Sequence, residues 1–139
     1  MYRYEDIKTI HLEVTQNCQA ACSMCDRNMN GEGINPHINL DELRLKDCKD
    51  IFTASFIKQL DTMYMCGNLG DPIVAKDTLE IFKYFREHNP NMWLSMNTNA
   101  GAKNEQWWKE LAQVFGKMGA VIFSVDGLLD TNHIYRQGV

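Results

Sequence analysis

Three cysteines near the start of the chain have a spacing that suits metal or cluster chemistry. Cys18, Cys22 and Cys25 form the pattern CxxxCxxC. Gaps this short let one loop place three thiolates around a metal ion or an iron–sulfur cluster, which cysteine thiolates hold, usually four to a cluster. Because only three cysteines lie together, the spacing favours a cluster with one iron left open, the arrangement typical of a catalytic site.

Two other interpretations of these cysteines stay open on the residues alone. His11 lies upstream and His37 downstream, so that either would complete a Cys₃His zinc site. The thiols could also be unconnected. Cys48 and Cys66 fall within an expected helix and at the end of an expected strand, where free cysteines usually act as small buried hydrophobic residues.

The elements that must position the cysteines alternate along the chain. Period-two or continuous apolar runs predict strands, and apolar residues at helical spacing predict helices. The expected strands are residues 7–15, 59–66, 92–98 and 120–125, and the expected helices are residues 40–55, 77–88 and 105–118. Residues 16–39 are expected to form a loop, Asn39 and Glu42 a capping box for the first helix, and Gly119 the end of the last helix.

This alternation predicts an α/β fold with parallel strands, since each return to the sheet crosses over through a helix. An open doubly wound sheet and a segment of a barrel both satisfy it. A full (β/α)₈ barrel takes about 250 residues, whereas this chain has 139. We therefore expect one domain over residues 1–139, a partial (β/α) barrel of about four units, incomplete at its C-terminus.

Polar or glycine-rich segments follow all four expected strands. They are Cys18–Cys25, Cys66–Pro72, Asn97–Gly101 and Ser124–Gly127. In parallel α/β folds the carboxyl ends of the strands share one edge, and ligands bind there. The sequence thus predicts that the cysteines and these segments form one site.

CxxxCxxC directly after a first strand resembles the signature of the radical S-adenosylmethionine (SAM) enzymes, and the following elements match that family's order. The resemblance implies a [4Fe–4S] cluster on Cys18, Cys22 and Cys25, with SAM chelating the fourth iron. It also implies an electron donor such as flavodoxin or ferredoxin. Reductive cleavage of SAM would give methionine and a 5′-deoxyadenosyl radical, which abstracts hydrogen from a substrate that the sequence does not identify.

The same resemblance implies a set of SAM contacts. Gly67-Asn68-Leu69-Gly70-Asp71-Pro72 resembles a family motif that usually ends Gly-Glu-Pro and contacts the SAM amino group, with Asp71 in place of Glu. A carboxylate beside an ammonium gains a charge-assisted hydrogen bond, and glycine lets the backbone approach a ligand closely. The other implied contacts are Asn97 and Asn99 in the cavity, Ser124 and Asp126 on the ribose or carboxylate, and Arg136 on the carboxylate.

Composition narrows the function classes. The 14 Lys and Arg against 18 Asp and Glu give a net charge of −4, which does not indicate nucleic-acid binding. No apolar run approaches the roughly 20 residues of a membrane span, and the N-terminus does not resemble a signal peptide, so we expect a cytoplasmic protein. Two alternative functions stay open. One is a non-catalytic subunit that binds the cluster or SAM and completes its fold with a second copy or a partner chain; the other is a zinc-stabilised binding module.

Overall fold

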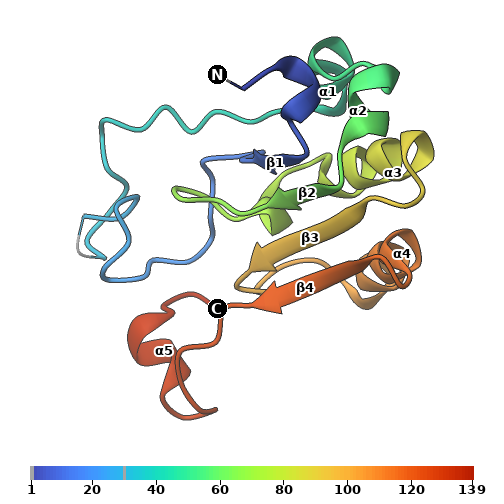
Figure 1. Ribbon diagram of the computed structural model, residues 1–139. Helices are drawn as coiled ribbons and strands as arrows, with labels where there is room; N and C mark the ends of the chain where they lie inside the picture. Colours follow the sequence, from blue (N-terminus) through green and yellow to red (C-terminus); the bar gives the residue numbers. More distant parts are fainter. Residues whose placement is uncertain (1, 30) are drawn as a thin grey trace.

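The computed structural model describes residues 2–29 and 31–139. Met1 and Asn30, which fall in the expected N-terminal segment and loop, lie outside the described residues. One sheet runs through the molecule in the order β1-β2-β3-β4, and every neighbouring pair is parallel (Figure 1). The strands are β1 (Thr9–Leu12), β2 (Thr62–Met65), β3 (Trp93–Thr98) and β4 (Gly119–Phe123). The predicted α/β class, with parallel strands and about four βα units, is confirmed.

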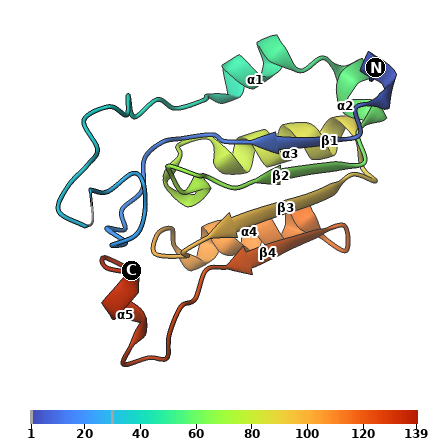
Figure 2. The same cartoon turned by 60° about the vertical axis from the view of Figure 1, so that its left-hand side comes forward.

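Helices α3 and α4 lie side by side behind the sheet (Figure 2). The helices are α1 (Leu45–Ile51), α2 (Ala54–Gln59), α3 (Thr78–His88), α4 (Glu105–Phe115) and α5 (Asn132–Tyr135), with 3₁₀ turns η1 (Tyr4–Asp6) and η2 (Pro72–Val74). Alternate strand residues such as Met63, Leu94 and Met96 point at the helices and are fully buried, together with Phe82 and Phe85 of α3. This core leaves the carboxyl edge of the sheet free for polar residues.

The expected helix over residues 40–55 is wrong at its start, and so is its Asn39–Glu42 capping box. Glu42 instead forms an antiparallel bridge with Thr15, and the Leu43 N–H donates to the Val14 carbonyl at 2.8 Å. This pairing holds the segment extended beside the end of β1. Helix α1 begins only at Leu45.

The same expected helix is also interrupted near its end. Phe52 and Thr53 both have extended backbone, and the Thr53 hydroxyl accepts a hydrogen bond from the Phe56 N–H at 3.3 Å, which caps the separate helix α2. Helix α4 likewise stops earlier than expected. Its C-cap is Gly116, with φ 55°, whereas Gly119 is the first residue of β4.

Two segments from opposite ends of the chain meet beyond the carboxyl ends of the strands. The loop after β1 and the segment carrying α5 both lie on that side of the sheet (Figure 1). They are joined by a hydrogen bond from the Ala21 N–H to the Gln137 carbonyl at 2.8 Å. No helix within residues 2–29 and 31–139 is long and apolar enough to cross a membrane.

Candidate functional site

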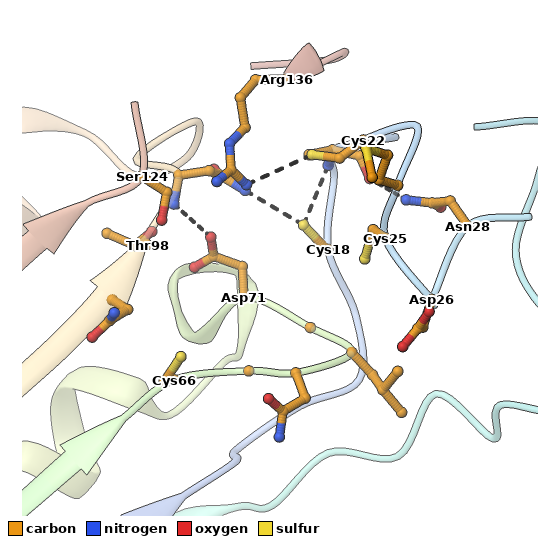
Figure 3. Close-up of a pocket in the computed structure, with 18 of the residues that line it drawn as sticks. Cys18, Cys22, Cys25, Asp26, Asn28, Cys66, Asp71, Thr98, Ser124 and Arg136 are labelled. Atoms are coloured by element: carbon orange, nitrogen blue, oxygen red, sulfur yellow. Dashed lines mark hydrogen bonds between the residues drawn. The ribbon is translucent and has the colours of Figure 1, made fainter. Parts of the chain in front are cut away.

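A cavity of about 330 Å³ opens where the strands end. The loops after β1, β2, β3 and β4 all contribute to its wall, as the order of strands and segments predicts. Figure 3 shows side chains from these loops facing one another. The predicted site residues that line the cavity are Cys18, Cys22, Cys25, Gly67, Asn68, Gly70, Asp71, Asn97, Asn99, Ser124 and Arg136.

The three cysteines share this cavity, and the sulfur atoms of Cys18 and Cys22 accept hydrogen bonds. Cys18 Sγ accepts from the Ala20 N–H and from Asn99 Nδ2, each at 3.4 Å. Cys22 is buried, and Arg136 Nη1 donates to its Sγ at 3.7 Å (Figure 3). Burial raises the pKa of the Cys18 thiol, and the Ala20 N–H partly opposes that rise. Donors aimed at sulfur suit thiolates that carry charge.

The histidines considered as zinc ligands stand apart from the cavity wall. His11 Nε2 lies 2.5 Å from the Cys66 carbonyl oxygen, and His37 is exposed in the loop. In the described part of the chain, no three His, Cys, Asp or Glu side chains are gathered closely enough to hold a metal ion. The three thiols thus line one cavity, but among the described residues they are not close enough together to bind a single metal ion.

The surroundings of Arg27 show whether the residues around the cysteines fit an anionic group bound to the thiolates. Its side chain is buried, with Nε donating to the Gln16 carbonyl and Nη1 to Asn28 Oδ1, each at 3.1 Å. No ion pair among residues 2–29 and 31–139 includes it. A buried charge without a counter-charge is costly, and Arg27 acts electrostatically on Cys18. Three thiolates on a cluster supply the missing negative charge, so the donor set fits such a group.

Asp71 connects two of the loops that form the cavity. Its Oδ1 accepts from the Ile73 N–H at 3.0 Å and caps η2, while its Oδ2 accepts from the Asn99 N–H at 2.7 Å. The side chain is buried. This carboxylate therefore fixes the loop after β3 to the loop after β2.

Two curated proteins resemble this chain over part of their length. No family model matches the chain. It is 28% identical over 109 residues to the FeMo cofactor biosynthesis protein NifB of Methanocaldococcus infernus, covering 76% of this chain and 35% of that protein. It is 26% identical over 115 residues to NifB of Methanocaldococcus jannaschii, covering 80% and 38%.

A solved structure is similar in fold to this chain. BtrN, in complex with AdoMet and 2-DOIA, superposes with a TM-score of 0.63 at 16% identity, over 95% of this chain and 52% of BtrN. NifB and BtrN are both radical SAM proteins. The chain is related to the radical SAM proteins. It spans only 35–38% of the NifB sequences and about half of BtrN.

The glycine-rich loop after β2 is packed against the chain itself. A Cβ on Gly67 would lie 2.1 Å from the Gly70 carbonyl oxygen, and a Cβ on Gly70 would lie 2.1 Å from that of Thr15. Neither position tolerates a side chain without backbone movement. The glycines are thus required by contacts within the protein, a reason that the resemblance alone did not give.

The segment after β4 differs from expectation at one residue. Ser124 and Arg136 line the cavity, but Asp126 is not part of its wall. The Asp126 carboxylate instead accepts a hydrogen bond from Arg136 Nε. Burial acts to lower the pKa of the Arg136 guanidinium, but Asp126 and Cys22 together outweigh burial and raise that pKa. Asp126 therefore lies behind Arg136 and orients it toward Cys22.

Three residues that shape the candidate site were not assigned to it from the sequence. Gln19 Nε2 donates to Asn99 Oδ1 at 2.6 Å, and the Glu13 carboxylate accepts from the Asn68 N–H at 3.1 Å. The third is the buried Arg27. Gln19 lies within the cysteine motif and Arg27 lies two residues after it, so their closeness in sequence to Cys18 and Cys25 was the available signal. Nothing in the sequence singled out their partners.

Proposed function

We propose that the chain binds a [4Fe–4S] cluster through Cys18, Cys22 and Cys25, binds SAM in the adjoining cavity, and cleaves it reductively. When bound, the cluster supplies one electron to SAM, which splits into methionine and a 5′-deoxyadenosyl radical that takes a hydrogen atom from the substrate. We place the reaction in the cytoplasm, with flavodoxin or ferredoxin as the class of electron donor.

The observation that carries this proposal is that the three cysteines and the loops after all four strands line one cavity. The relationship to NifB and the likeness of the fold to AdoMet-bound BtrN support the same function. The buried guanidinium of Arg27 is hydrogen-bonded but has no ion pair among residues 2–29 and 31–139, which supports an anionic group on the thiols.

The chain's own residues have distinct roles in this proposal. The loop after β1 supplies the thiolates, and Arg27 and Arg136 balance their charge. Gly67, Asn68, Gly70, Asn97 and Ser124 face SAM from the other loops, with the exposed Met24 beside them. Asp71 holds two of these loops together and keeps lone pairs that a SAM ammonium can share.

The test is anaerobic reconstitution with iron and sulfide, reduction with dithionite, addition of SAM, and measurement of 5′-deoxyadenosine. We expect about four iron and four sulfide per chain and formation of the nucleoside. Cys→Ala at position 18, 22 or 25 should abolish both. Cys48→Ala is the matched control, because Cys48 lies in the hydrophobic core, and it should keep the cluster.

The outcomes separate the candidate functions. A full cluster retained after Cys22→Ala would refute the ligand assignment. One zinc per chain after anaerobic purification, with no iron uptake, would favour the zinc-stabilised module. A stable cluster without 5′-deoxyadenosine would favour a chain that needs further polypeptide for turnover.

The partner-dependent function has an observation in its favour. Large apolar side chains are exposed along and after β4: Ile122, Phe123, Val125, Leu128, Leu129 and Ile134. Exposed apolar patches mark interaction surfaces. We propose that residues 1–139 form a radical SAM core domain whose barrel is completed over this surface by further polypeptide, from a second copy or a partner chain.

A further inference from the structure

Asn99 is held by more hydrogen bonds than a cavity-lining side chain needs. Its N–H donates to Asp71 Oδ2 at 2.7 Å. Its Oδ1 accepts from Gln19 Nε2 at 2.6 Å and from the Gly101 N–H at 2.8 Å. Its Nδ2 donates to Cys18 Sγ at 3.4 Å. The residue is buried, and these bonds fix both its backbone and its amide.

The two donors on Oδ1 determine which end of the amide faces the sulfur. Turning the amide over would place its NH₂ group against the N–H groups of Gln19 and Gly101 and leave two donors unsatisfied. Nδ2 must therefore point at Cys18 Sγ. The sulfur has a side-chain donor in addition to the backbone N–H of Ala20.

The backbone next to Asn99 is strained in a way that serves this placement. Ala100 has φ 61°, in the left-handed region, which is unfavourable for a residue with a Cβ. Its N–H donates to Thr98 Oγ1 at 3.0 Å. Strain of this kind concentrates at functional sites, and here it turns the chain so that Gly101 reaches Asn99 Oδ1.

We infer that Asn99 is a positioning residue for Cys18, and that its N–H···S hydrogen bond raises the reduction potential of a cluster on that thiolate. This inference rests on the proposed function. Hydrogen bonds to the sulfurs are among the factors that set cluster potentials. Reduction of the cluster adds negative charge, part of which lies on the ligand sulfur. A hydrogen bond becomes stronger as its acceptor becomes more negatively charged. The bond therefore stabilises the reduced form more than the oxidised form.

The test is a redox titration of the reconstituted, SAM-free protein, followed by electron paramagnetic resonance. Asn99→Ala removes the donor, and Asn99→Asp keeps the shape but places an oxygen against the sulfur. At a fixed potential we expect the ratio of reduced to oxidised cluster to fall about tenfold in Asn99→Ala, equivalent to about 59 mV for one electron. It should fall further in Asn99→Asp. Asn97→Ala removes another amide from the wall of the same cavity, two residues earlier on β3, and should leave the potential of the SAM-free protein unchanged.

Equal potentials in wild type, Asn99→Ala and Asn99→Asp, each with full iron content, would overturn the inference. Where the Asn99 variants lose their cluster, Gln19→Leu provides the second variant, because it removes one of the two donors that fix Asn99 Oδ1 but keeps Nδ2 as a donor to Cys18. A smaller downward shift is expected there, and no shift would again overturn the inference. Failure of wild type to bind a cluster would instead overturn the proposed function, and the inference with it.

Discussion

The Asp71 carboxylate and the backbone of Asn99 are joined across two loops, with Oδ2 accepting the Asn99 N–H at 2.7 Å. The other oxygen accepts the Ile73 N–H at 3.0 Å. Asp71, which stands where the family motif usually has glutamate, thus accepts hydrogen bonds from the protein's own backbone. One methylene fewer keeps the carboxylate close to the loop that it caps.

Asp71→Asn should therefore destabilise the cluster-free protein. The new amide would place its NH₂ group against one of the two N–H donors that the carboxylate now satisfies. Hydrogen bonds to charged groups contribute about 1.5–3 kcal/mol, so we expect the free energy of unfolding in urea to fall by about 2 kcal/mol.

Asp26→Asn is the matched control, because Asp26 also lines the cavity but is an exposed residue of the cysteine loop. Its urea midpoint should match that of wild type. Unchanged stability of Asp71→Asn, with a loss confined to SAM affinity, would contradict a role in joining the two loops.

Arg27→Met should separate cluster retention from fold stability. Removing the buried charge removes the counter-charge to the thiolates, and changes around bound metal commonly cost 10-fold or more in affinity. We expect iron loss to a chelator to be about tenfold faster. The free energy of unfolding of the cluster-free chain should change by about 1 kcal/mol or less, because a buried unpaired cation is itself unfavourable.

Arg86→Met supplies the comparison, since Arg86 also donates to carbonyls, those of Met92, Val114 and Met118 among them, but far from the cysteines. Its loss should lower the free energy of unfolding by about 3 kcal/mol and leave iron retention unchanged. Identical behaviour of the two variants would argue against a special role of Arg27.

The sequence predicted best those elements whose signals are local. Helix α3, expected over residues 77–88, is found at Thr78–His88, because its apolar spacing and the Pro90 after it need no tertiary information. The helix expected over residues 40–55 was wrong because Glu42 pairs with Thr15, a residue of the β1 loop. Tertiary pairing of this kind overrides the intrinsic helix propensity of a segment.

The same division applies to the candidate site. The position of the cysteines and of Asn97 and Ser124 at strand ends predicted one cavity, and they share it. The contact between Asn99 and Cys18 joins residues 81 apart in the sequence. It depends on how two loops pack over the sheet, which no local pattern encodes.

Cys48 should make stability depend on pH above neutrality. It is fully buried, and burial, with a smaller effect of Asp47, raises its pKa from 9.0 to about 11. Between these pH values the unfolded chain releases the Cys48 proton while the folded chain keeps it, so rising pH favours unfolding. Below pH 9 both states are protonated and the effect vanishes.

We therefore expect the free energy of unfolding to fall more steeply from pH 9 to pH 11 in wild type than in Cys48→Ala. Urea titrations of the cluster-free chain at several pH values measure the two slopes. Cys18 and Cys66, whose pKa values burial also raises, are common to both proteins. Equal slopes in the two proteins would show that burial does not raise the pKa of Cys48.

The apolar surface along and after β4 should make the chain associate with itself. Leu129 is fully exposed and Ile122 is 53% exposed. Within residues 2–29 and 31–139, no strand pairs with the outer edge of β4. An unpaired strand edge beside apolar side chains is a template for association. Sedimentation velocity of the cluster-free chain should show an average mass that rises with concentration.

Leu129→Glu and Ile122→Glu should each weaken that association by about tenfold or more, about 1.4 kcal/mol, because a carboxylate would be buried in the contact. Ile51→Glu is the matched control, since Ile51 is 58% exposed but lies on α1. A monomer at every concentration would contradict self-association. If Ile51→Glu weakened self-association as much as the other two variants, the contact would not lie on the apolar surface beside β4, because Ile51 is not part of that surface.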